Sequence, residues 1–312
     1  MEKDKITLFK IRNFGEYLND TFSFLKTEGK LFFTNFMKLS GGYFILLILL
    51  TYILFDLFYE STVSGTTDNV DQFINNNFGI TILLVLAVAC IAIFVAIHIF
   101  TFPVIYLNNM INQPENNKDT KALNKQIKSN VKRGISFFLL TILLVGPLVV
   151  IAFSLSAVLI FLIIGLPLLL LIGPFSTSVV AIAYYDYVIQ KSGFFDAYKQ
   201  AFKLIKVDFW GILGNSFILM FIMQTLGYIA TMLPNMLYYV GLFTSTLSEY
   251  EMQQLGYYKV VVAIMLIVGS IISYLMYTVL LVNQGLVYYS SREYLESYQS
   301  MLDIETIGQN NE

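Results

Sequence analysis

The sequence has little charge, one cysteine and one histidine. Only 13% of its 312 residues are charged, while 57% are hydrophobic. A water-soluble domain carries about a quarter charged residues, so this chain has too few to cover a surface that faces water. The single cysteine, Cys90, excludes an internal disulfide. Because His98 is the only histidine, no site of histidine and cysteine ligands can form, and we expect neither metal nor cofactor.

The sequence also lacks the patterns that mark nucleic-acid binding and catalysis. Its net charge of -2 excludes an extended basic surface, so nucleic acid is not an expected partner. No glycine-rich phosphate-binding loop is present. A serine–histidine–acid triad would have to use His98, which has no nucleophile motif near it. We therefore predict that the protein is not an enzyme.

Long apolar runs dominate what is present. A transmembrane helix needs about 20 apolar residues, and the runs here predict an all-α polytopic membrane bundle with about six transmembrane helices. We expect a cytoplasmic amphipathic segment at 1–40, a membrane domain at 41–289 and a cytoplasmic tail at 290–312. The predicted spans are 41–59, 79–107, 135–153, 157–183, 211–232 and 260–282. The polar cluster Ser154–Ser156 sets the border between the third span and the fourth.

One stretch of the sequence occurs twice. Gly193–Trp210 resembles Phe14–Lys30, 180 residues earlier, and both copies lead directly into an apolar run. The matched pairs are Phe14 and Phe194, Glu16 and Asp196, Phe22 and Phe202, Lys26 and Lys206, and Glu28 and Asp208. Apolar residues recur in both copies at the i, i+3, i+4 spacing of an amphipathic helix. The predicted internal repeat is thus an amphipathic helix followed by a helical hairpin.

Two features of this repeat are open. The weaker stripe of Leu123, Ile127 and Val131 indicates a degenerate third copy of the amphipathic helix. Each such helix either lies in the headgroup plane or packs beneath the bundle. Because both clear copies run straight into a span, we favour packing against the bundle.

The distribution of positive charge predicts an orientation. Of the 19 lysines and arginines, all but Lys259 fall in the N-terminal segment, in 108–133, in 191–206 or in the tail. Short cytoplasmic loops carry an excess of these residues, so both termini are predicted to be cytoplasmic. Tyrosines close the even-numbered spans, at Tyr106, Tyr184–Tyr187 and Tyr288–Tyr289, and are expected at the cytoplasmic interface.

Polar residues near the spans have mostly structural interpretations. Asp56, His98 and Asp186 lie close to span ends and can reach water there. The amides Asn215, Gln224, Asn283 and Gln284 are expected to hydrogen-bond between helices.

The fourth predicted span contains a candidate break. Its residues Gly165, Pro167, Gly173 and Pro174 could interrupt the helix, and backbone groups freed at such breaks coordinate substrates in transporters. The alternative is an ordinary kink that neighbouring helices satisfy, which we favour.

Three stretches carry a resemblance to a known group: the amphipathic FFDAYKQAFKLIKVDFWGIL, the YYD at 184–186 and the tail VYYSSREYLESYQSMLDIETIG. They resemble a group of bacterial integral membrane proteins without an assigned activity. That group is similar to the membrane domain attached to some glycerophosphoryl diester phosphodiesterases. The resemblance implies a six-helix bundle in the bacterial cytoplasmic (inner) membrane. The catalytic barrel of those phosphodiesterases is absent from this chain, so no catalytic residue carries over.

Together these features favour a non-enzymatic scaffold or accessory subunit. Lys199, Lys203 and Lys206 are its candidate contacts with the membrane surface or with a cytoplasmic or membrane protein, and membrane lipids are its expected surroundings. The alternative is a small-molecule or lipid transporter that uses the candidate break at Gly165–Pro174 as part of a path.

Overall fold

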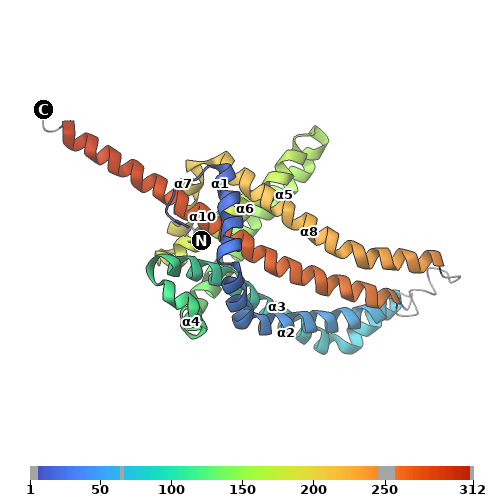
Figure 1. The fold of residues 1–312 in the computed structure, drawn as a ribbon. Coiled ribbons are helices and arrows are strands. Elements are labelled where there is room, and N and C mark those ends of the chain that lie inside the picture. The colour runs from blue at the N-terminus through green and yellow to red at the C-terminus, as the bar shows by residue number, and fades with distance from the viewer. Residues whose placement is uncertain (1–5, 64–66, 245–256, 310–312) are drawn as a thin grey trace. The chain divides into compact units, whose positions relative to one another are not determined.

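The computed structural model describes residues 6–63, 67–244 and 257–309, and these residues form helices without any β-strand (Figure 1). Short 3-10 helices cover Pro114–Lys118 and Leu159–Leu162, and one π-helical turn covers Thr141–Val145. The α-helices are α1 (Phe14–Thr27), α2 (Gly29–Val63), α3 (Thr67–Asn112), α4 (Thr120–Leu140), α5 (Gly146–Val158), α6 (Gly165–Ile189), α7 (Phe194–Val207), α8 (Phe209–Thr244) and α10 (Tyr257–Gln309).

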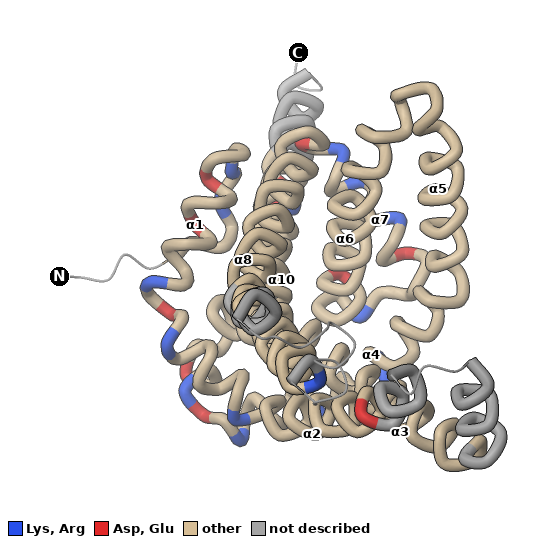
Figure 2. Tube along the Cα trace, turned by 90° about the vertical axis from the view of Figure 1, so that its right-hand side faces the viewer, with Lys and Arg blue, Asp and Glu red and all other residues tan. Residues whose placement is uncertain are grey.

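Six stretches of helix are long and apolar enough to cross a membrane. They are Gly29–Asp56, Phe78–Asn112, Thr120–Leu162, Gly165–Ile189, Phe209–Met232 and Lys259–Ser297. Many large apolar side chains of these stretches are exposed, which is unfavourable in water but favourable in lipid. Phe161, for example, is 92% exposed, and α5 carries no charged residue (Figure 2). The prediction of an all-α polytopic bundle is confirmed, and the chain is an integral, multi-pass membrane protein.

The internal repeat is visible in the helix boundaries. α1 and α7 have 14 residues each and begin at Phe14 and Phe194, and α2 and α8 begin at Gly29 and Phe209, so the two copies keep the same offset. α4 opens a third unit, because it buries Leu123 and Ile127 of the predicted stripe and leads through α5 to α6. The first and last units therefore share one offset, and α4, α5 and α6 follow the same order of elements, although α4 continues into α5 through the π-helical turn.

The helices divide into two compact units. Unit 2 holds residues 40–96 and 222–276, and its aromatic rings pack closely. Phe44 and Tyr274 stack with their ring centroids 3.9 Å apart, and the Tyr274 hydroxyl donates to Ser40 Oγ. Asp56 and Lys259 form an ion pair in the same unit.

Unit 1 holds residues up to 39, 97–221 and 277 onward, and its core is built from the ends of α3, α6 and α10. The tyrosines that close the even-numbered spans are buried within the protein, most of them completely: Tyr106, Tyr184, Tyr185, Tyr187, Tyr288 and Tyr289. Several of their hydroxyls have partners, since Tyr184 pairs with Thr101 at 2.5 Å and Tyr185 donates to the Leu281 carbonyl at 2.8 Å. The amphipathic helices cover this end of the bundle, which buries the tyrosines within the protein, and their depth in the membrane stays a prediction.

Three of the four predicted amides are buried and join the helices of unit 1, whereas the fourth, Gln224, is exposed and belongs to unit 2. Asn215 of α8 and Asn283 of α10 exchange side-chain hydrogen bonds of 2.7 and 3.1 Å. Asn283 also donates to Thr21 Oγ of α1 at 2.9 Å. Gln284 donates to Ser216 Oγ at 2.8 Å, which extends the same network along α8.

The turn between the third and fourth spans lies at 159–164 and not at the predicted Ser154–Ser156. The Ser156 hydroxyl donates to the backbone carbonyl four residues earlier at 2.8 Å, so this serine is satisfied inside α5. The chain reverses at Ile163, whose φ of 66° is left-handed. Two residues later, a Cβ on Gly165 would overlap the Ser156 carbonyl oxygen. The backbones on the two sides of the turn thus approach so closely that only glycine fits at this position.

No break interrupts α6, which runs from Gly165 to Ile189. Pro167 lies in the first turn, where its missing N–H removes no helical hydrogen bond. Gly173 and Pro174 lie inside the helix, which continues past them. The structure therefore matches the favoured alternative of an uninterrupted helix, in which the proline is accommodated within the span.

Two helices continue beyond the predicted spans. α8 passes Pro234, where the sequence predicted its end, and reaches Thr244. α10 continues through the predicted tail to Gln309. Membrane helices tolerate proline because neighbouring groups satisfy the freed carbonyl.

The close approach of α3, α6 and α10 predicts the effect of one glycine substitution. A Cβ on Gly285 would overlap Leu107 Cδ1 and Tyr185 Oη. We expect Gly285→Ala to destabilise the protein by about 1–3 kcal/mol, the usual cost of overpacking, measured as a lower unfolding temperature in detergent. Gly227→Ala is the control, since no atom lies within 4 Å of its added Cβ. Equal unfolding temperatures for the two variants would contradict this packing.

Candidate functional site

Helix α7 presents three faces with different chemistry. Successive residues of a helix are about 100° apart, which places these faces at separate angles. The face that packs on the bundle holds Ala197, Tyr198, Ala201, Leu204 and Ile205. The second face holds Asp196, Gln200 and Lys203 at i, i+4, i+7 spacing, and the third holds Phe195, Lys199, Phe202 and Lys206.

The buried face fixes α7 on unit 1. The Tyr198 ring stacks on Phe137 with an interplanar angle of 6°, and its hydroxyl pairs with Thr141 Oγ at 2.9 Å. Burial raises the pKa of Tyr198 to about 12. The sequence prediction that the amphipathic helix packs against the bundle is confirmed for α7.

The first amphipathic helix is fixed differently. Asn13 and Glu16 form a capping box at the start of α1. The buried Arg12 donates to Asp20 at 2.8 Å, and its backbone N–H donates to Ser290 Oγ at 2.9 Å. The backbone N–H of Asn13 and the neighbouring Lys10 lower the pKa of the Glu16 carboxyl, and the hydrogen bond from Lys10 to Glu16 raises the lysine pKa.

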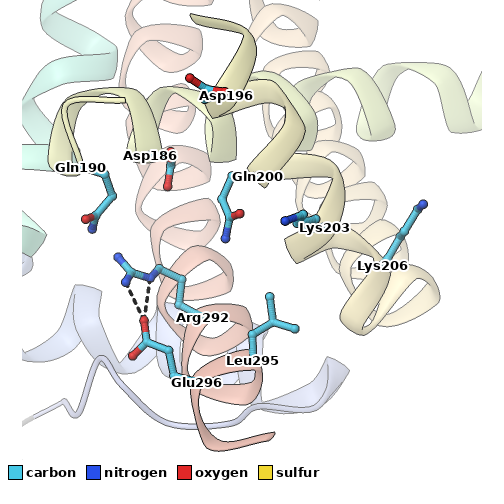
Figure 3. Close-up of a pocket in the computed structure, with 9 residues that line it drawn as sticks. All are labelled: Asp186, Gln190, Asp196, Gln200, Lys203, Lys206, Arg292, Leu295 and Glu296. Carbon is cyan, nitrogen blue, oxygen red and sulfur yellow. Dashed lines mark hydrogen bonds and ion pairs between the residues drawn. The ribbon is translucent and has the colours of Figure 1, made fainter. Parts of the chain in front are cut away.

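The second face of α7 lines a polar pocket of about 680 Å³ (Figure 3). The pocket lies between the C-terminal end of α6, helix α7 and the part of α10 beyond Tyr288, where the apolar runs of α6 and α10 end. Its lining consists of Asp186, Gln190, Asp196, Gln200, Lys203, Lys206, Arg292, Leu295 and Glu296. It therefore combines three acidic, three basic and two amide side chains.

Asp186 and Lys203 are charged groups of this pocket without an ion-pair partner among the described residues. Asp186 is only 5% exposed; its Oδ2 accepts from Ser192 at 2.8 Å, and its Oδ1 lies 3.5 Å from the Tyr288 hydroxyl. Arg292 does have a partner, since it donates to Glu296 at 2.5 and 3.1 Å. That pair is half exposed on the Glu296 side, and exposed pairs contribute at most about 1 kcal/mol.

The structure separates the three predicted contact lysines. Lys203 reaches into the pocket, whereas Lys199 lies on the third face of α7. Lys206 belongs to that third face and also to the pocket rim, and its side chain points away from the other lining residues (Figure 3). All three are exposed.

The residues of the candidate break also lie apart from this pocket. Pro167 lines an apolar groove of about 270 Å³ with Leu170 and Leu171 of α6 and with Trp210, Leu213, Gly214 and Phe217 of α8. Gly165, Gly173 and Pro174 do not line it. The groove holds no ionisable group and has the chemistry of a lipid tail.

Most of the pocket has no distinct signal in the sequence. Gln190, Gln200, Arg292 and Glu296 were not singled out, and Asp186 was interpreted only as an interfacial residue. A signal was present, because Asp196, Gln200 and Lys203 share a helical face that is neither apolar nor opposite to the apolar face. No cluster of three or more histidine, cysteine, aspartate or glutamate residues in the described ranges could hold a metal ion.

The chain was compared with protein-family models, curated proteins and solved structures. No protein-family model, no curated protein and no solved structure matches it. The function must therefore be argued from the helices and the pocket.

The raised pKa of Tyr198 predicts a pH dependence of stability. Its folded-state pKa of about 12 exceeds the ordinary 10.0, so folding favours the neutral phenol. The resulting stability is fully present below pH 10 and is lost as the pH rises toward 12. Tyr198→Phe should lose about 1 kcal/mol at neutral pH, with its hydrogen bond, but should lose less stability than the wild type between pH 10 and 12, measured by thermal unfolding in detergent.

Thr141→Val is the matched control for this prediction. It removes the same hydrogen bond but keeps the ionisable phenol, so it should lose similar stability at neutral pH and retain the alkaline loss. If Tyr198→Phe and Thr141→Val had identical pH profiles, the buried phenol would not be the titrating group.

Proposed function

We propose that this chain is a non-enzymatic scaffold or accessory subunit of a membrane complex. In this proposal the third face of α7, with Phe195, Lys199, Phe202 and Lys206, contacts an acidic surface of a protein partner. The observation behind this proposal is that α7 packs on unit 1 through its buried face while these four side chains are exposed. Phe195 is 75% exposed and Phe202 is 44% exposed.

The composition of the third face supports a protein contact. Aromatic residues are enriched at protein interfaces, and positive charge selects an acidic counterpart. No ion pair occupies Lys199 or Lys206 within the described part of the chain, so both ammonium groups are available. Because α7 is already ordered, little conformational entropy is lost when it binds.

The location belongs to the same proposal. The resemblance described above supports the bacterial cytoplasmic membrane. The excess of lysine and arginine in the N-terminal segment, in 108–133, in 191–206 and in the tail supports cytoplasmic termini. In this orientation α1, α4 and α7 all belong to the cytoplasmic side.

A lipid transporter is the second candidate. The observation that favours it is the apolar groove beside Pro167, which could hold an acyl chain between α6 and α8. Nothing charged lines that groove, so it would not by itself select a polar substrate.

The scaffold proposal predicts a partner that depends on charge. The chain purified from native membranes in mild detergent should carry one protein at a fixed stoichiometry, measured by quantitative mass spectrometry. Lys199→Gln with Lys206→Gln should reduce that protein at least about tenfold, since each charged hydrogen bond contributes about 1.5–3 kcal/mol.

The control keeps the charge at the same positions. Lys199→Arg with Lys206→Arg should retain the partner. A preparation that holds this chain and lipid, but no protein at a fixed stoichiometry, would contradict the scaffold. Loss of the partner in both double variants would mean that charge is not what the partner recognises.

The proposed orientation has a separate test. A reporter enzyme that folds only outside the cytoplasm should be active when fused after Asp68 and inactive when fused after Lys128, measured in intact cells. The reason is that 60–77 holds no lysine or arginine, whereas 118–133 holds six. The reverse pattern of activity would overturn the orientation.

A further inference from the structure

We propose that the polar pocket between α6, α7 and α10 binds a zwitterion with a phosphate and an ammonium group, the chemistry of a phosphoethanolamine headgroup. This site lies on the second face of α7 and shares only Lys206, at its rim, with the protein contact proposed for the third face. Its residues come from three helices, and Figure 3 shows Asp186, Gln190, Gln200, Lys203 and Arg292 around one shared space.

The phosphate would lie between Lys203 and Arg292. Lys203 comes from α7 and Arg292 from α10, so two different walls of the same pocket each supply a cation (Figure 3). The guanidinium offers several N–H donors in a plane that suits phosphate oxygens, and the ammonium adds a compact charge. Glu296, which now accepts from Arg292, has a side chain that is 52% exposed and can turn into water when an anion replaces it.

The ammonium group would lie against Asp186. This carboxylate is nearly buried, yet its pairing within the described residues is confined to the hydroxyls of Ser192 and Tyr288. The positive charge of Arg292 acts on Asp186 through space, but no ion pair joins the two side chains. A buried carboxylate without a direct ion pair is costly, so a cationic ligand group would offset that cost. The amide oxygens of Gln190 and Gln200 can accept the remaining ammonium hydrogens.

The position of the pocket favours a lipid headgroup over other zwitterions. Asp186 lies three residues before the end of α6, and Arg292 lies four residues after the buried Tyr288. The pocket thus opens where two apolar spans give way to polar sequence, which is the depth of headgroups in a bilayer. A soluble phosphoethanolamine would present the same two charges, and the experiment separates these sources.

The test uses the full-length chain purified in detergent. Its affinities for phosphatidylethanolamine and phosphatidylglycerol are measured by native mass spectrometry during lipid titration. We expect phosphatidylethanolamine to bind at least about tenfold more tightly, because phosphatidylglycerol leaves Asp186 without its cation. Lys203→Gln should weaken phosphatidylethanolamine binding about tenfold or more, and Lys203→Arg should restore it.

Lys128→Gln is the matched control, since this lysine is exposed on α4 and does not line the pocket. Asp186→Asn should remove the preference between the two lipids while keeping its hydrogen bond from Ser192. Because Lys203 is exposed, its variant should unfold at the wild-type temperature, so the test stands even if Asp186→Asn unfolds.

Soluble O-phosphoethanolamine provides the second arm. If it binds with the same sensitivity to Lys203→Gln and the lipid does not, the ligand is a soluble zwitterion. If only the lipid binds, the ligand is a membrane headgroup, and both results support the site. Measurable and equal binding of the two lipids, or equal effects of Lys203→Gln and Lys128→Gln on the ligand that binds, would overturn it. Loss of the protein partner alone would leave these affinities unchanged, so the two proposals fail separately.

Discussion

The reciprocal amide pair of Asn215 and Asn283 is the interaction on which unit 1 depends. Both side chains are completely buried among apolar helices, where an unsatisfied amide would be costly. Each amide satisfies the other, and Asn283 also binds Thr21, so α1, α8 and α10 can meet only in the register that completes all three hydrogen bonds. Apolar contacts between membrane helices are not specific in this way, which gives the amides their importance for alignment.

With that register fixed, the amphipathic helices act as a cover over the ends of α3, α6 and α10. The cover explains why tyrosines such as Tyr185 and Tyr288 are fully buried although they close the spans. The covering helix α7 also supplies polar residues next to the buried core, which allows a polar pocket to form there. The pocket has one wall from a span, one from α10 and one from the covering helix α7, so its charges are held by elements that are themselves packed.

Much of the fold could be predicted from sequence because membrane helices have strong and simple signals. Length and hydropathy predicted six spans, and the echo between Phe14 and Phe194 predicted the repeat that the helix boundaries confirm. Local signals that depend on tertiary contacts failed. Ser156 looked like a break but bonds within its own helix, and the burial of the tyrosines depends on covering helices that cannot be read from the spans.

The candidate site was predictable only in part. Lys203 was identified by its charge, but its separation from Lys199 depends on which face of α7 packs on unit 1. Arg292 and Asp186 are 106 residues apart and belong to different repeat units, so no local pattern joins them. Finally, the contacts of α1 have a consequence for biosynthesis. Its partners Ser290 and Asn283 are made more than 260 residues later, so these hydrogen bonds of the first helix can form only after the last helix has been synthesised.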